Sequence, residues 1–120
     1  MDDRLQKALD FSNYRITLFL QKENIKVKVD SLLTYAINGG IFKANIELIT
    51  FVNLIKSQGH TSVVLIDKNN NPIEITDLEK FQSDLLSRYF EATNFYYSEY
   101  TKLRKTRSVK ESFDDIVSED

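Results

Sequence analysis

The sequence predicts a single α+β domain that is mainly α-helical, with two or three helices, one small β-hairpin and an acidic flexible tail. Three observations lead to this class. Apolar residues recur at helical spacing over residues 76–110, with neither Gly nor Pro among them. A shorter segment with the same spacing covers residues 45–59. Residues 62–75 form two short β-branched runs around an asparagine-rich turn. We assign residues 1–108 to the domain and residues 109–120 to the tail.

The composition is that of a folded chain with nearly balanced charge. Of the 120 residues, 42% are hydrophobic and 12% are aromatic, and the formal net charge is −2. This balance argues against a strong overall attraction to nucleic acid or to an anionic membrane. The absence of cysteine excludes disulfides and thiolate metal ligands. No apolar run approaches the ~18 residues of a membrane span, so we expect a cytoplasmic protein with no membrane partner.

Residues 3–38 permit two interpretations, one long helix or a β-hairpin. As a hairpin, residues 14–20 and 25–29 would alternate between apolar and polar, with residues 21–24 as the loop. That loop has no Gly, Pro or Asn-Gly pair, and a helical period continues across it, so the helix is favoured. Gly39-Gly40 would then end the helix, because glycine adopts the left-handed C-cap conformation without penalty. The apolar face of this helix would be Phe11, Tyr14, Leu18, Ile25, Val29, Leu32 and Ala36.

Two shorter elements follow, each with its own boundary signals. Asn45 is a good N-cap for a helix of three to four turns, which Gly59 closes. Ser62–Asp67 and Ile73–Ile75 then predict a β-hairpin around the turn at residues 68–72. An isolated hairpin is marginally stable in water, so we expect this one to pack on the helices.

Residues 76–110 predict one long helix. Thr76 and Glu79 have the spacing of a capping box, in which each side chain satisfies a backbone amide at the helix start. One apolar face comprises Leu78, Phe81, Leu85, Tyr89, Ala92, Tyr96 and Leu103, and Leu86, Phe90 and Tyr97 flank it. This apolar surface is larger than two short helices and a hairpin can readily cover.

The second half of this helix is the candidate interaction surface. It combines aromatic and basic side chains: Tyr89, Phe90, Phe95, Tyr96, Tyr97, Tyr100, Lys102, Arg104, Lys105 and Arg107. Rings at helical spacing form a core or an interface, and tyrosine is enriched in buried contact patches, so a protein–protein interface is favoured. The alternative is an accessory protein that holds single-stranded nucleic acid by stacking bases on the rings beside the basic residues.

Other candidate sites have simpler explanations. His60 is the single histidine and has no nucleophile or second imidazole nearby in the sequence, which indicates a surface loop residue. Gly39-Gly40 lacks the pattern of a phosphate-binding loop. The acid and three amides of Asp67–Asn71 lack EF-hand spacing and indicate an asparagine turn. We therefore expect no enzymatic activity, no metal, no cofactor and no small-molecule substrate.

Several stretches resemble a small protein of T-even-type tailed phages. They are Leu9-Asp-Phe-Ser-Asn-Tyr-Arg-Ile16, Leu33-Thr-Tyr-Ala-Ile-Asn-Gly-Gly-Ile-Phe-Lys43 and Ser87-Arg-Tyr-Phe-Glu-Ala-Thr-Asn-Phe-Tyr-Tyr97, the last continuing through the basic end to Lys110. The order of elements is also similar. The group that the chain resembles is the prohead core, or internal scaffold, proteins of these phages.

This resemblance implies a non-enzymatic structural protein that assembles with copies of itself and with other capsid-assembly proteins, inside the prohead in the host cytoplasm. It also implies processing, because the prohead protease of these phages cuts after Glu in an aliphatic-x-Glu context. Glu111 and Glu119 both stand in that context, within the expected tail.

Overall fold

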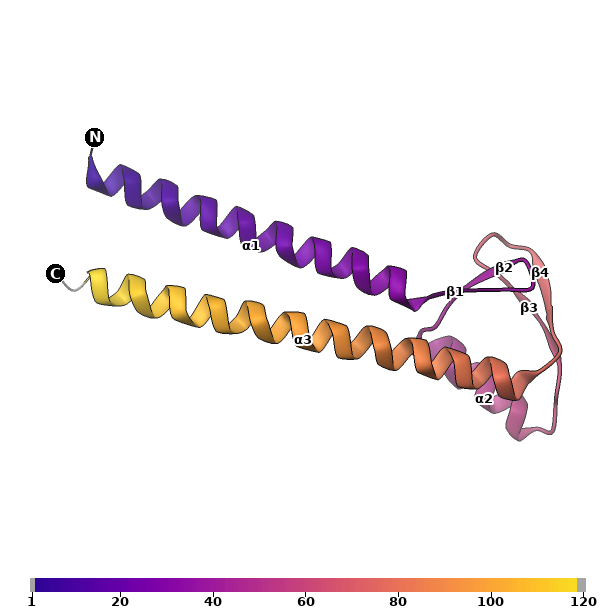
Figure 1. Ribbon diagram of the computed structural model, residues 1–120. Coiled ribbons are helices and arrows are strands. Elements are labelled where there is room, and N and C mark those ends of the chain that lie inside the picture. Colours follow the sequence, from indigo (N-terminus) through magenta and orange to yellow (C-terminus); the bar gives the residue numbers. More distant parts are fainter. Residues whose placement is uncertain (1, 119–120) are drawn as a thin grey trace. The chain divides into compact units, whose positions relative to one another are not determined.

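The computed structural model confirms the expected class, mainly α with a smaller β component (Figure 1). It describes the backbone of residues 2–118 and the side chains of residues 2–105. The elements follow in the order α1 (Asp3–Leu33), β1 (Thr34–Ile37), β2 (Gly40–Lys43), α2 (Ile46–Ser57), β3 (Val63–Ile66), β4 (Pro72–Ile75) and α3 (Leu78–Ser118).

Contacts divide the chain into two compact units. Unit 1 comprises residues 1–28 and 95–120, and unit 2 comprises residues 29–94. Unit 1 is therefore built from the first part of α1 and the last part of α3, whereas unit 2 holds both hairpins and α2. The expectation of one domain at 1–108 followed by a tail at 109–120 stays a prediction.

Residues 3–33 form one helix, α1, which confirms the helical interpretation for that range. The prediction is wrong for residues 34–38, which are not part of the helix. Asp2 caps α1, since its Oδ1 accepts from the amide of Arg4 at 3.0 Å. The helix ends at Leu33, not at Gly39-Gly40, and residues 34–43 form a hairpin that the sequence interpretation missed. Asn38 and Gly39 occupy its two-residue turn with φ of 51° and 80°, the positive values that a type I′ turn requires.

The second hairpin and α2 lie close to their predicted positions. Asn45 caps α2, with its Oδ1 accepting from the amide of Leu48 at 2.9 Å. Strands β3 and β4 pair antiparallel, with Val63 opposite Ile75 and Ile66 opposite Pro72. The predicted hairpin is therefore confirmed, and its proline starts a strand.

The start of α3 differs by one residue from the predicted capping box at Thr76. Asp77 is the cap, because its Oδ1 accepts from the amide of Lys80 at 3.1 Å. The helix runs on to Ser118. Of the predicted apolar face of α3, Leu78, Phe81, Leu85 and Ala92 are buried in unit 2, and Tyr89 is half-buried there.

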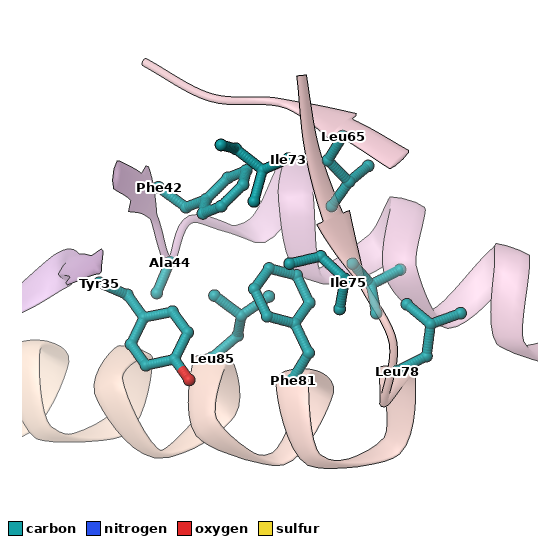
Figure 2. Packing of buried hydrophobic residues seen from close by; sticks show 10 residues of the cluster. Tyr35, Phe42, Ala44, Leu65, Ile73, Ile75, Leu78, Phe81 and Leu85 are labelled. Carbon is teal, nitrogen blue, oxygen red and sulfur yellow. The ribbon is translucent and has the colours of Figure 1, made fainter. Parts of the chain in front are cut away.

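The hydrophobic core of unit 2 is centred on Phe81, which is completely buried. Figure 2 shows this ring rising from α3 towards Tyr35 and Phe42 of the first hairpin. Its centroid lies 5.9 Å from that of Tyr35 and 5.5 Å from that of Phe42, the latter in an edge-to-face arrangement that favours both rings. The other buried members of the cluster are Ala44, Val52, Leu65, Ile73, Ile75, Leu78 and Leu85.

Candidate protein–protein interface

Helix α1 carries two apolar stripes on opposite faces. The inner stripe in unit 1 is half-buried and comprises Tyr14, Leu18 and Ile25. A second stripe, the outer stripe, comprises Leu5, Leu9, Ile16, Leu20 and Val27, whose exposed fractions run from 44% to 70%. Residues two apart are about 200° apart around a helix of 3.6 residues per turn, so Ile16 and Leu18 point in nearly opposite directions.

The exposed apolar side chains of the described residues are concentrated in unit 1. Ten of the 17 large hydrophobic side chains that are exposed belong to residues 2–28 and 95–105, although these make up the smaller part of the described chain. Besides the outer stripe they include Phe11, Phe19, Tyr96, Tyr97 and Tyr100. Scattered exposed apolar residues are ordinary, but a row at helical spacing along one face marks a surface that another helix can cover.

The aromatic residues predicted to form one surface on α3 are divided between the two units. Tyr89 is half-buried and Phe90 is 55% exposed, and both belong to unit 2. Phe95 is half-buried in unit 1, whereas Tyr96, Tyr97 and Tyr100 are exposed there, with Tyr97 the most exposed at 73%. Three of the six rings therefore lie exposed together on the unit 1 part of α3.

The predicted basic cluster follows these rings along α3. Lys102, Arg104 and Lys105 are exposed, and the side chain of Arg107 lies outside the described residues. Lys102 Nζ donates to Glu99 Oε1 at 3.1 Å, an exposed ion pair of small energetic weight.

The sign of the charge differs between the parts of the chain. Residues 2–28 and 95–105 of unit 1 carry nine basic and five acidic side chains, whereas unit 2 carries five basic and eight acidic ones. Residues 106–120 carry two basic and five acidic ones. The net charge of −2 thus conceals a basic helical surface.

A pocket of about 250 Å³ lies within unit 1 between the two helices. The half-buried side chains of Ile25 and Leu103 provide apolar lining, one from each helix. Its other lining residues are the exposed Lys22, Lys26, Tyr96 and Tyr100. The pocket therefore combines apolar, aromatic and cationic groups.

The loop at Asp67–Asn71 forms a turn, as predicted, and its acid has a structural role. Asp67 is 5% exposed, and its carboxylate accepts three backbone N–H groups, from Ile41 at 3.0 Å, Asn69 at 3.0 Å and Asn71 at 2.8 Å. These hydrogen bonds, that of Asn71 first, hold the pKa of Asp67 below its usual range. The carboxylate thereby ties the β3–β4 loop to β2. His60 is exposed, as expected.

Residues 2–105 contain no group of three or more His, Cys, Asp or Glu side chains that could hold a metal ion. No helix in the described chain has an apolar stretch long enough to cross a membrane. The two predicted processing sites, Glu111 and Glu119, fall outside the residues with described side chains.

Sequence interpretation missed the outer stripe of α1. Its members are separated by four or seven residues, which is a readable signal. The signal was hidden because residues 14–20 alternate between the inner and the outer stripe, and this alternation is also that of a β-strand. A helix with apolar residues on opposite faces produces both patterns at once.

Comparison with known proteins assigns no family to this chain. No family model, no curated protein and no solved structure matches it.

Proposed function

We propose that this chain is a non-enzymatic assembly protein that self-associates through unit 1. The observation that carries the proposal is the outer stripe of α1, a row of five exposed aliphatic side chains on the face of the helix opposite its half-buried stripe. Helices with such a row pack as bundles, with the rows buried between them. Tyr97 and Tyr100 of α3 add exposed aromatic area to the same unit.

The magnitude of this burial suits reversible association. Fully burying a Leu, Ile or Val side chain contributes ~1.5–3 kcal/mol, so each half-exposed one contributes about 1 kcal/mol. Five side chains from each of two copies contribute about 10 kcal/mol on that basis, whereas association costs ~4–15 kcal/mol. The stripe therefore supports an oligomer whose formation depends on protein concentration.

The role that fits such a protein best is a component of an internal scaffold. The resemblance of residues 9–16, 33–43 and 87–97 to prohead core proteins supports this role. In this proposal the partners are other copies of the chain and further capsid-assembly proteins, and assembly takes place in the host cytoplasm and the prohead interior.

Light scattering after size exclusion, over a concentration series, tests the self-association. Replacing both Ile16 and Leu20 by Glu removes four apolar side chains from a dimer, about 4 kcal/mol, and should weaken it roughly a thousandfold. A matched control places Glu at Thr17 and Asn24, which are exposed polar positions off the stripe. A wild-type chain that stays monomeric at every concentration, or equal effects of both variants, would refute the proposal.

A second candidate function is the binding of single-stranded nucleic acid. It is favoured by the exposed rings of Tyr97 and Tyr100 beside the exposed basic residues Lys102, Arg104 and Lys105. Affinity for a short oligonucleotide would then fall linearly with salt concentration on a double logarithmic plot. Loss of that affinity on replacing both tyrosines by Ala, with dimerisation retained, would assign the rings to nucleic acid.

A further inference from the structure

We propose that the pocket in unit 1 binds the acidic segment Glu111–Asp120 of a second copy of the chain. This inference rests on the proposed self-association, because it names another copy as the partner. It adds a second contact, distinct from the outer stripe of α1.

The size of the pocket is suited to a peptide side chain and not to a whole small molecule. At about 250 Å³ it falls below the ~300–1,000 Å³ of sites that enclose a whole small molecule. It suits one or two side chains inserted from a peptide. Ile25 and Leu103 offer that side chain an apolar surface, and the rings of Tyr96 and Tyr100 line it as well.

The positive charges at the pocket favour an acidic peptide as the ligand. Lys22 and Lys26 both line it and both are exposed. Lys26 Nζ lies 3.4 Å from Glu23 Oε1, but both side chains are about half exposed or more, so this ion pair yields readily to a competing carboxylate. Within residues 2–105, no hydrogen bond or ion pair engages the side chain of Lys22. Basic residues outnumber acidic ones by nine to five in residues 2–28 and 95–105 of unit 1, the ranges that contribute the pocket lining.

Residues 111–120 have the matching chemistry. The segment carries five acidic side chains and no basic one, and three apolar residues stand among them: Phe113, Ile116 and Val117. Carboxylates on either side of an apolar anchor match a pocket with lysines beside an apolar surface. Phe113, which is followed directly by Asp114 and Asp115, is the best anchor.

The geometry of α3 makes the contact intermolecular. The helix is continuous to Ser118, so Phe113 lies ten residues, about 15 Å along the axis, beyond Leu103. Because α3 is continuous, its residues 111–118 extend along the axis away from the pocket that the same helix lines, and they do not reach it. The segment that fills the pocket must therefore come from another copy, which links copies through a basic pocket and an acidic end.

The test uses a fluorescent peptide of residues 109–120 added to the full chain, with binding followed by anisotropy. We expect saturable binding that weakens several-fold when salt is raised from about 0.05 to about 0.5 M. Replacing Lys22 and Lys26 by Glu should weaken binding at least tenfold. The control replaces Arg4 and Lys7 by Glu, an equal charge change at exposed positions of α1 outside the pocket, and should have little effect.

A charge swap makes the result specific to the pocket. A peptide with Lys at positions 114 and 115 should recover binding to the chain that carries Glu at positions 22 and 26. Absence of peptide binding, equal loss in the control chain, or failure of the swap would overturn the inference. So would an oligonucleotide that displaces the peptide and binds more tightly with the same dependence on Lys22 and Lys26, because the pocket would then be a nucleic-acid site.

The outcome is separable from that of the proposed self-association. The chain with Glu at positions 16 and 20 should lose the contact through the outer stripe and still bind the peptide, because Ile16 and Leu20 do not line the pocket. Any association of this chain that remains in light scattering should disappear when Lys22 and Lys26 are also replaced by Glu. Dimerisation without peptide binding would refute the pocket contact alone. Peptide binding by a chain that never dimerises through the stripe would refute the stripe alone.

Discussion

Replacing Gly40 by Ala should destabilise unit 2 through one identifiable clash. A Cβ at this position would lie 2.5 Å from Cγ1 of Ile73, 3.0 Å from its Cδ1 and 3.2 Å from Cε2 of Phe42. Cγ1 is held close to the backbone of β4, so relief requires the two hairpins to shift against each other. Overpacking of this kind costs ~1–3 kcal/mol, and the reduced freedom of the unfolded chain returns ~0.4–1 kcal/mol. The free energy of unfolding of unit 2 should therefore fall by about 1–2 kcal/mol.

A double-mutant cycle in urea, followed by far-ultraviolet circular dichroism, measures this clash. Replacing the buried Ile73 by Ala should itself cost about 2–5 kcal/mol, because it leaves a cavity. In that background Ala at position 40 should cost nothing or be slightly stabilising, since both clashing atoms of Ile73 are gone. Additive effects of the two substitutions would refute the close approach of Ile73 to Gly40.

Three further predictions concern single groups of unit 2. Because the pKa of Asp67 is lowered in the folded chain, its carboxylate stabilises the fold above the unfolded pKa of about 3.9, and this stabilisation is lost as pH falls through the folded pKa. The urea midpoint of D67N should therefore fall less with acid than that of the wild type. Burial, with the hydrogen bond that Tyr35 donates to Asp84 Oδ2 at 2.7 Å, raises the pKa of Tyr35 to about 12, so its stabilisation is lost as pH rises from about 10 to about 12. Phenolate absorbance should show a late ionisation step near pH 12, and Y35F should lack that step. Gly39→Ala should cost about 1 kcal/mol in urea, because φ is 80° with open space around it, and Gly39→Asn should cost less; equal costs would contradict the turn geometry.

Elements were predicted correctly from the sequence where the residues at their boundaries are typical of one local structure only. Asn45 as a helix cap and the asparagine turn between β3 and β4 were both predicted, because each signal is local. The cap of α3 was misplaced by one residue because Thr76 and Asp77 are both competent N-caps, and tertiary packing decides between such neighbours.

The missed hairpin has a specific cause. Asn38-Gly39 is the strongest short hairpin signal known, yet Ala36 continued the helical spacing of Val29 and Leu32 by coincidence, so the glycines were assigned to a helix end. Tertiary packing favours the hairpin over a helix end here, because Tyr35 and Phe42 are paired across the hairpin and both contact Phe81. Contacts at that sequence separation leave no local signal.

The candidate interface was partly predictable. The exposed tyrosines and basic residues of α3 were visible as a composition cluster. The outer stripe of α1 and the pocket were not identified, because the first was confused with strand alternation and the second requires two helices from opposite ends of the chain. Both depend on knowing which face of each helix is covered.

Oxidative cross-linking at Ile16 tests the central claim, association through the outer stripe, most directly. Ile16 lies midway between Leu5 and Val27, so in a fully overlapped two-fold dimer it meets its counterpart whether the copies run parallel or antiparallel. The chain has no cysteine, so Ile16→Cys provides a single thiol, and Thr17→Cys provides a matched control beside the stripe. We predict that the Ile16→Cys chain forms disulfide-linked dimers on non-reducing gels much faster than the control. Equal rates, or no dimer from either chain, would contradict association through the outer stripe.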